Sequence, residues 1–139
     1  MLDQIIEFIG NHYILVTVFI ALVGAFMFNE GKLGGATVST SELVTLINRE
    51  NALVLDIRNQ NEFNAGHIVD AKNIPLSSID SRLADLEKYK TLPVIVVCKM
   101  GQNSGAVGKK LRAAGFEKTF RLRGGIAEWN ASNLPLVRK

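Results

Sequence analysis

Cysteine is nearly absent from this chain: Cys98 is the single one among 139 residues. An intrachain disulfide is therefore excluded, and with it a small secreted domain stapled by disulfides. A lone thiol suits a reducing compartment. The length corresponds to one domain of ordinary size. A content of 47% hydrophobic and 21% charged residues excludes a disordered or collagen-like polymer.

Basic residues are absent from the first 29 positions, where Asp3 and Glu7 carry the formal charges. Residues 30–139 hold all 16 basic residues against 11 acidic ones, a balance of +5. The two parts are therefore expected to be in different surroundings. We divide the chain into an N-terminal transmembrane anchor at 1–29, a Gly-rich linker at 30–36 and a domain at 37–139.

The anchor is predicted from 21 residues without a formal charge, 8–28. A helix of that length rises about 31 Å, which matches the apolar core of a bilayer. From Ile14 onward the run is apolar on every face except at Thr17, so a surface helix of a soluble protein is disfavoured. The rival interpretation is a secretory signal peptide, but such peptides begin with basic residues, whereas this start is acidic.

The orientation of the anchor follows from its flanking charges. Lys and Arg accumulate on the cytoplasmic side of a membrane, and here the first one, Lys32, follows the span. We therefore expect a single-pass protein of the inner membrane with its N-terminus outside and its domain in the cytoplasm. Such a position would bring the domain close to membrane proteins as partners.

Short β-branched runs alternate with amphipathic stretches after the linker, as in βα units of a parallel sheet. Predicted strands cover 53–57, 94–98 and, more weakly, 119–122. Ser39 ahead of Glu42 and Asn59 ahead of Glu62 predict two capped helix starts. Further helices are predicted at 78–89, from Asn103 to Gly115, and at 126–131. The predicted fold class is α/β.

The most informative stretch is VIVVCKMGQNS at 94–104, where a buried strand delivers Cys98 into a loop that leads into a helix. Ligands of open α/β sheets bind outside the carboxyl ends of the strands. Backbone N–H groups of the loop can converge on the cysteine sulfur and stabilise a thiolate. The competing interpretation is a buried structural cysteine.

Basic residues surround this stretch: nine lie between Lys88 and Arg123, against Glu117 alone. An anionic substrate or an acidic partner is therefore favoured. No motif for nucleic-acid binding accompanies the positive balance.

Three motifs give the domain a family resemblance: LVLDIRNQNEFNAGHIVDAKNIP at 53–75, VIVVCKMGQNS at 94–104 and LRGGIAEWNASNLPL at 122–136. With them, the chain from Val38 to Leu136 resembles a single-domain rhodanese of the thiosulfate sulfurtransferase family. With its apolar start it is similar to the membrane-anchored bacterial members. The resemblance implies a five-stranded parallel sheet between helices.

The resemblance also implies an activity. Cys98 takes a sulfane sulfur from thiosulfate or a persulfide, forms a persulfide, and passes the sulfur to a thiol or a protein acceptor. No metal or organic cofactor is needed. The loop that would bind the substrate consists of Lys99, Met100, Gly101, Gln102, Asn103 and Ser104.

The loop departs from the family pattern Cys-Arg-x-Gly-x-Arg-Ser/Thr, because Lys99 and Asn103 replace its two arginines. Lysine lacks the planar fork that grips two oxygens, and asparagine is neutral. Thiosulfate is therefore expected to be a poor donor relative to a persulfide. A cysteine phosphatase, the nearest alternative enzyme, needs an arginine where this chain has Ser104.

Other motif residues are expected to be structural. The resemblance implies a charge pair between Asp56 and Arg58 that braces the active-site side of the sheet, although Arg58 could instead contact the substrate. His67 is expected to be a hydrogen-bonding turn residue and Trp129 a core residue, and Gly124 and Gly125 are expected to allow close packing near the loop.

Two further functions stay open. One is a protein-binding module of the same fold with little or no catalysis, and the other is a redox sensor that stores oxidised sulfur on Cys98.

Overall fold

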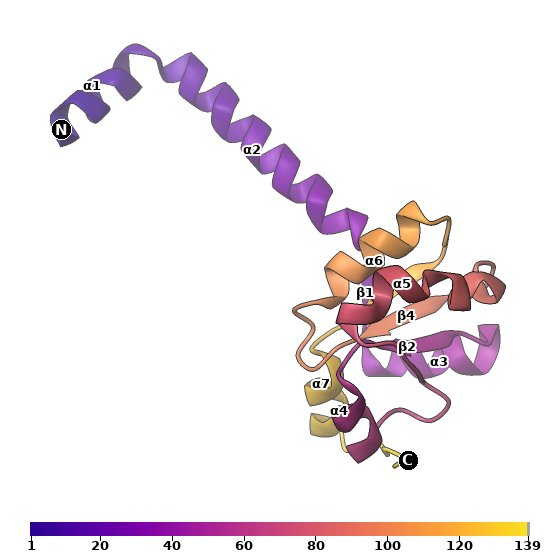
Figure 1. The fold of residues 1–139 in the computed structure, drawn as a ribbon. Helices are drawn as coiled ribbons and strands as arrows, with labels where there is room; N and C mark the ends of the chain where they lie inside the picture. The colour runs from indigo at the N-terminus through magenta and orange to yellow at the C-terminus, as the bar shows by residue number, and fades with distance from the viewer. Residues whose placement is uncertain (139) are drawn as a thin grey trace. The chain divides into compact units, whose positions relative to one another are not determined.

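The structure, a computed structural model, describes residues 1–138, with the backbone alone at 30–33. The chain divides into two compact units, one from Met1 to Lys32 and one from Leu33 onward. The first unit is helical, and the second contains the sheet (Figure 1).

The first unit consists of α1 (Leu2–Asn11) and α2 (Tyr13–Leu33). The helices are separated at His12, whose φ of −124° and ψ of 35° leave the helical region. Among the described residues no single helix has the length and apolar composition of a membrane span; α1 with Tyr13–Asn29 passes that test only as a pair bent by 93°. The prediction of one continuous helix over 8–28 is wrong, because the helix is interrupted at His12. Gly10 and Asn11, weak helix formers, directly precede the break.

Five parallel strands form the sheet of the second unit, in the order β1-β5-β4-β2-β3. They are β1 (Ala36–Val38), β2 (Leu53–Asp56), β3 (Lys72–Asn73), β4 (Val94–Val97) and β5 (Thr119–Leu122). The α/β class and the three predicted strands are confirmed, although β2 and β4 each end one residue before the predicted position. Sequence reasoning missed both edge strands, which are short.

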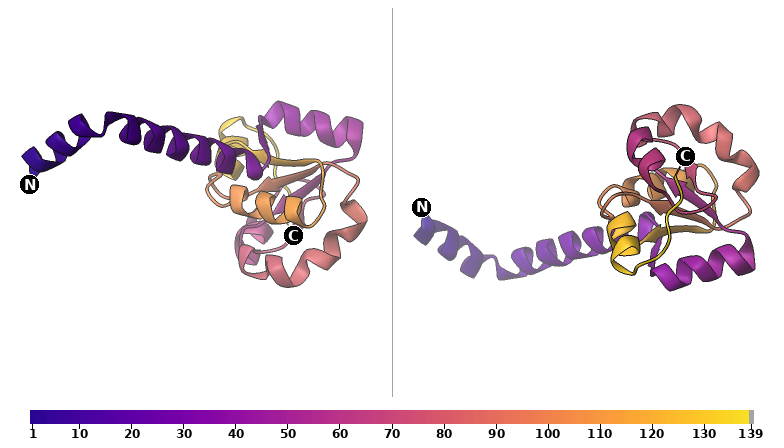
Figure 2. Two further views of the ribbon diagram at one scale, coloured as in Figure 1. Left: turned by 90° about the horizontal axis from the view of Figure 1, so that it is seen from above. Right: turned by 90° about the horizontal axis from the view of Figure 1, so that it is seen from below.

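Helices cover both faces of the sheet (Figure 2). They are α3 (Thr40–Glu50), α4 (Gln60–Ala65), η1 (Leu76–Ser78), α5 (Ile79–Arg82), η2 (Leu83–Tyr89), α6 (Ser104–Ala113) and α7 (Gly125–Ala131). One core cluster joins alternate residues of β2 and β4 to α5, η2 and α6. The other joins the opposite faces of these strands to α3 and α7. This three-layer arrangement buries both faces of β2 and β4, as their near-continuous apolar runs predict.

Both predicted helix caps are confirmed. Ser39 and Glu42 form a reciprocal capping box at the start of α3, and the Asn59 side chain accepts a hydrogen bond from the Glu62 N–H at the start of α4. The single helix predicted over 78–89 is wrong, because α5 is one turn and continues as the 3₁₀ segment η2. The Ser81 hydroxyl donates to the Ser78 carbonyl in this turn, a local bond that competes with regular helix geometry.

The predicted linker at 30–36 lies partly on residues 30–33, whose side chains are outside the described residues. Of the rest, Gly34 and Gly35 are buried and Ala36 begins β1. Gly34 packs directly on α6, since a Cβ atom at Gly108 would overlap the Gly34 carbonyl oxygen. These three residues thus belong to the packed second unit.

Candidate active site

Cys98 directly follows β4, at the carboxyl edge of the sheet. Its side chain is buried, with 4% of the residue exposed. The backbone N–H of Gly101 donates a hydrogen bond to its Sγ atom over 2.9 Å. A hydrogen-bond donor at this position faces the sulfur atom that would carry out nucleophilic chemistry. Of the loop N–H groups predicted to converge on the sulfur, that of Gly101 is the one that the described residues show in contact with it.

Two residues of the loop hold that donor in place. Gly101 has a φ of +86°, a conformation that favours glycine. The hydroxyl of Ser104, the first residue of α6, donates to the Gly101 carbonyl over 3.1 Å. Ser104 is 1% exposed. The hydrogen bond from the Ser104 hydroxyl therefore holds the Gly101 backbone in this position.

The start of α7 holds the loop from the other side. The N–H of Ile126 donates to the Cys98 carbonyl over 2.9 Å, and that of Ala127 donates to the Lys99 carbonyl over 3.0 Å. Gly125 makes this approach possible, because a Cβ atom there would overlap the Cys98 carbonyl oxygen. The expectation of close packing near the loop is confirmed for Gly125, whereas a Cβ atom at Gly124 would instead meet the Glu128 side chain. The two hydrogen bonds were not predicted, since nothing local in the sequence links positions 98 and 126.

Four side chains of the loop are turned toward solvent: Lys99, Met100, Gln102 and Asn103 are all exposed. The Lys99 ammonium lies 3.8 Å from a carboxylate oxygen of Glu62 on α4. Asn103 is the N-cap residue of α6, without a side-chain capping bond. These side chains are the ones available to meet a donor or a partner.

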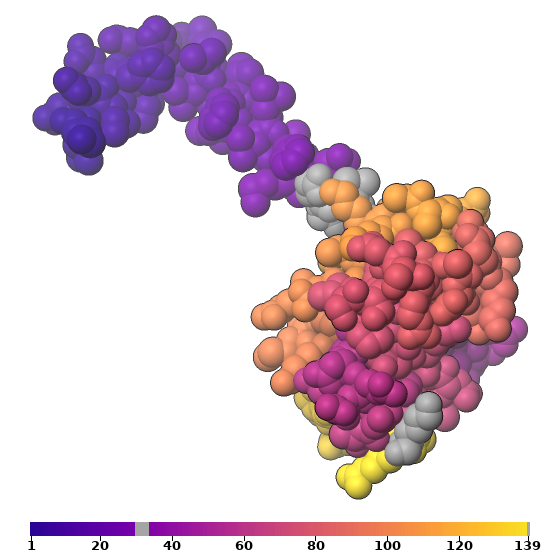
Figure 3. Space-filling view, in the orientation of Figure 1, coloured from indigo at the N-terminus to yellow at the C-terminus, as the bar shows by residue number. Residues whose placement is uncertain are grey.

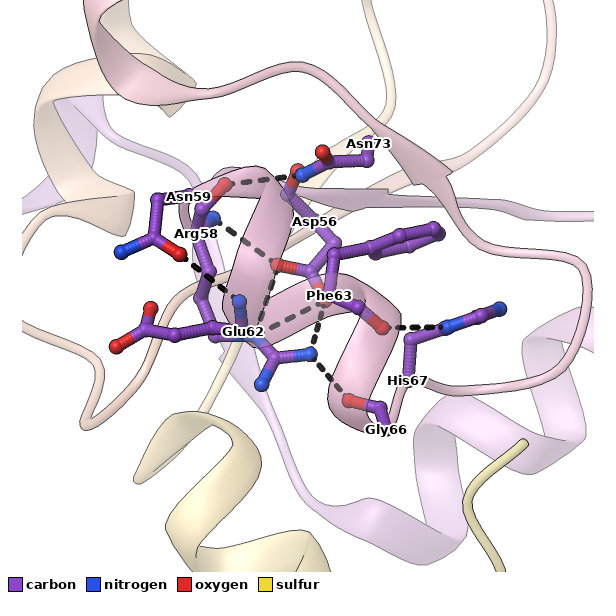
Figure 4. Close-up of polar contacts among 8 residues, drawn as sticks. All are labelled: Asp56, Arg58, Asn59, Glu62, Phe63, Gly66, His67 and Asn73. Atoms are coloured by element: carbon purple, nitrogen blue, oxygen red, sulfur yellow. Dashed lines mark hydrogen bonds and ion pairs between the residues drawn. The ribbon is translucent and has the colours of Figure 1, made fainter. Parts of the chain in front are cut away.

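Asp56, the last residue of β2, and Arg58 form a buried ion pair (Figure 4). Nη2 of Arg58 lies 2.7 Å from the Asp56 carboxylate, and Nε donates to the same group. Nη2 also donates to the Gly66 carbonyl over 2.7 Å. The side chains are 8% and 1% exposed. This geometry fits the predicted bracing role of the pair.

Asn73 completes this brace and was missed by the sequence analysis. Its amide donates to the carbonyls of Asp56 and Arg58, over 3.0 and 2.9 Å. Figure 4 shows the Asn73 side chain, which comes from β3, beside Asp56 and Arg58 at the end of β2. No local signal marked Asn73, because the carbonyls that it meets are 17 and 15 positions away in the sequence.

His67 and Trp129 have the structural roles expected of them. Nδ1 of His67 lies 2.8 Å from the Phe63 carbonyl oxygen, and the His67 ring stacks on that of Phe63. The backbone of His67 pairs with Val137, which fastens the end of the described chain to the domain. The indole N–H of Trp129, a core residue, donates to the Pro135 carbonyl.

A pocket of about 540 Å³ lies beside this brace, lined by residues of α4, β3 and the η1–α5 segment and not by Cys98. Figure 3 shows α4 (magenta) and the α5–η2 segment (red) adjoining on this face. Within the part of the chain that the structure describes, no group of three or more His, Cys, Asp or Glu side chains is arranged to hold a metal ion. Cys98 itself offers a nucleophilic sulfur beside a backbone donor.

Comparison with known proteins agrees with this geometry. Residues 39–132 match the family model described as "Rhodanese-like domain". The "Uncharacterized protein YibN" of Escherichia coli is 38% identical over 141 residues and covers 99% of both chains. "Thiosulfate sulfurtransferase GlpE" of Pseudoalteromonas translucida is 30% identical over 95 residues, 68% of this chain and 89% of the relative.

Among solved structures, a rhodanese-related protein from Thermoplasma volcanium superposes with a TM-score of 0.68 at 27% identity. The match covers 76% of this chain and 100% of the other. The matched residues 39–132 include β2 to β5 and the Cys98 loop. The chain therefore belongs to the rhodanese-like domain family.

Proposed function

We propose that the protein is a sulfurtransferase whose Cys98 carries the transferred sulfur as a persulfide. The observation that carries the proposal is the 2.9 Å hydrogen bond from the Gly101 N–H to Sγ, in a loop held by Ser104 and α7. A donor fixed before the reaction stabilises negative charge on sulfur without reorganisation. That charge is present on the thiolate and on the terminal sulfur of a persulfide.

The transfer proceeds in two displacements. The Cys98 thiolate attacks the outer sulfur of the donor, the S–S bond of the donor breaks, and the leaving thiolate or sulfite keeps the electron pair. An acceptor nucleophile then attacks the terminal sulfur of the Cys98 persulfide and releases the Cys98 thiolate. Each step exchanges one bond to sulfur for another, so no external oxidant or reductant is consumed.

The donor in this proposal is a thiol persulfide, small or carried by a protein, used in preference to thiosulfate. Lys99 offers one ammonium, and it lies next to the Glu62 carboxylate. Asn103 is neutral and exposed. Neither residue supplies the bidentate grip that an arginine gives to a sulfonate-like group. The acceptor is a thiol or a protein thiophile.

The proposal includes attachment to the inner membrane through α2, with the N-terminus outside and the domain in the cytoplasm. Its support is the apolar, exposed surface of α2 and the lack of Lys and Arg in residues 1–29. A tether of this kind would hold the domain near a membrane-protein partner that gives or receives sulfur.

The second candidate is a protein-binding module of the same fold with little or no catalysis. The exposed side chains of Lys99 and Met100 favour it, with Met100 60% exposed beside a buried thiol. Methionine is an adaptable contact residue at protein-binding surfaces.

Intact mass spectrometry separates the two candidates. The full chain in detergent micelles, as wild type and Cys98→Ser, is treated with thiosulfate and, separately, with a small thiol persulfide. We expect a gain of one sulfur atom from the persulfide that cyanide removes and that Cys98→Ser never shows. Folded protein with a titratable thiol that gains no sulfur from either donor would reject the enzyme in favour of the binding module.

A further inference from the structure

The helix α1 separates its residues into an apolar and a polar face. At about 100° per residue, one side collects Leu2, Ile5, Ile6, Phe8 and Ile9, and the other collects Asp3, Gln4, Glu7 and Asn11. The five apolar side chains are between 45% and 74% exposed. A helix with this division is suited to a boundary between an apolar and an aqueous medium.

The helix α2 has a different surface. Between Ile14 and Phe28 it is apolar on every face except at Thr17, and the Thr17 hydroxyl is satisfied by the Tyr13 carbonyl at 2.7 Å. Such a helix needs an apolar medium on all sides, whereas a single protein partner would cover one face. The two helices therefore suit different positions: α2 the interior of an apolar medium, and α1 the boundary between that medium and water.

The angle between the helices provides those two positions. The axes of Leu2–Asn11 and Tyr13–Asn29 differ by 93°, as the bend in Figure 1 shows. When α2 enters a bilayer, α1 is parallel to the bilayer surface. The residues at the bend are Asn11, His12 and Tyr13, which are polar or amphipathic and suit the headgroup region.

The apolar surface is continuous around the bend. A pocket of about 390 Å³ in the angle is lined by Phe8 of α1 and by apolar residues of α2, namely Leu15, Val16, Val18, Phe19 and Leu22. A medium that covers α2 therefore also reaches the apolar face of α1. Asp3 and Glu7 gain nothing from anionic headgroups, so apolar burial in lipid is what holds α1.

We propose that α1 is an interfacial helix. It lies along the bilayer surface, with Leu2 and Ile9 at the boundary between headgroups and acyl chains and with Glu7 in water. The inference rests on the membrane attachment through α2 proposed above.

Depth measurements on spin labels test this arrangement. The full chain carries Cys98→Ser, which leaves no native thiol, together with Leu2→Cys, Glu7→Cys, Ile9→Cys or Phe19→Cys, one at a time. Each nitroxide-labelled protein is reconstituted in vesicles of phosphatidylethanolamine and phosphatidylglycerol. Its exposure to oxygen and to a water-soluble relaxation agent reports the depth of the label.

We expect labels at positions 2 and 9 to have the same depth, although about 10 Å of helix axis separates them. The label at position 7 should be in water. A depth difference of about 10 Å between positions 2 and 9 would mean that α1 continues across the bilayer and would overturn the inference. Labels at both positions shielded from oxygen and from water would place protein, not lipid, on this face, with the same consequence.

Phe19→Cys distinguishes this inference from the attachment on which it depends. A deep label at position 19 with a failed comparison of positions 2 and 9 would reject the interfacial helix alone. A water-exposed label at position 19 would reject the attachment through α2, and the interfacial helix with it.

Discussion

Gly125 lies against the carbonyl of Cys98 so closely that a methyl group on residue 125 would overlap the carbonyl oxygen. This approach brings the Ile126 N–H within 2.9 Å of the same oxygen. Residues of α7 thus set the position of the cysteine, although they lie 27 and 28 positions along the chain. The first prediction follows from this relationship.

Gly125→Ala should displace the Cys98 loop and slow persulfide formation about tenfold or more, because small misplacements of a nucleophile are costly. The φ of +60° at this residue adds about 1–2 kcal/mol of destabilisation for alanine. Quenched time courses of persulfide formation measure the rate, and thermal unfolding measures the stability.

The matched control is Gly115→Ala. Gly115 also has a positive φ, but a Cβ atom there meets only the end of the Lys90 side chain, at 3.7 Å. This variant should lose stability without losing transfer rate. Equal transfer rates in the two variants would mean that α7 does not position Cys98.

Ser104→Ala removes the hydroxyl that donates to the Gly101 carbonyl. We expect a loss of about 1 kcal/mol in unfolding free energy and slower sulfur loading, because Gly101 carries the N–H that meets Sγ. Ser81→Ala is the control, since its hydroxyl makes the same type of bond to Ser78 over 3.0 Å on an exposed turn. Unchanged loading in Ser104→Ala would leave that hydroxyl with a role in stability alone.

The double variant Lys99→Arg with Asn103→Arg restores the two arginines of the family pattern. We expect the rate with thiosulfate to rise about tenfold, the value of one charge-assisted hydrogen bond of about 1.5 kcal/mol, and the rate with a small thiol persulfide, which has no sulfonate-like group, to stay unchanged. Steady-state kinetics with both donors measures the ratio. A wild-type protein that already prefers thiosulfate would contradict the assignment of persulfide as donor.

Arg58→Met leaves the Asp56 carboxylate buried without its partner, with Asp56 1% exposed. The expected loss is about 3–5 kcal/mol of unfolding free energy, measured by urea denaturation. Because the guanidinium is bound to Asp56 and Gly66, the transfer rate per folded molecule should be unchanged. A selective rise in the KM for the donor would instead show that Arg58 contacts it.

Glu42 provides a pH-dependent contribution to stability. Hydrogen bonds from the backbone and the side chain of Ser39, with the nearby charge of Arg123, hold the pKa of this carboxyl below its usual 4.5. A carboxyl whose pKa is lowered in the folded state stabilises the fold at pH values above its unfolded-state pKa. This stabilisation is lost as the pH falls through the folded-state pKa. The thermal midpoint of the wild type should therefore exceed that of Glu42→Gln at neutral pH by more than it does at pH values below 4.5. A difference independent of pH would contradict the role of the charge.

The sequence was sufficient to predict those features that depend on residues close together in the chain. The runs 53–57 and 94–98 predicted β2 and β4 because strands buried on both faces must be apolar throughout. The caps at Ser39 and Asn59 were predictable because each bond joins residues three apart. The Cys98 loop was predictable because a strand, a loop and a helix follow each other directly.

The edge strands were not predictable on the same grounds. β1 has two exposed residues and β3 has none that is fully buried, so neither shows an apolar run. Each is a strand because it pairs with a neighbour distant in sequence, β1 with β5 and β3 with β2. The bend at His12 was missed for a related reason. The composition and length of an apolar stretch do not show whether its helix is continuous or bent.

The α/β class, the inner strands, the helix caps and the position of the candidate sulfur-carrying residue were predictable from the amino-acid pattern, because each depends on neighbours along the chain. The groups that surround Cys98 depend instead on how distant segments pack. The Gly101 N–H reaches Sγ because Ser104 and the start of α7 hold the loop. The brace at Asp56 is complete because Asn73 arrives from another strand. Hydrogen bonds between distant segments form only after the chain has packed, and no pattern of neighbouring residues encodes their geometry.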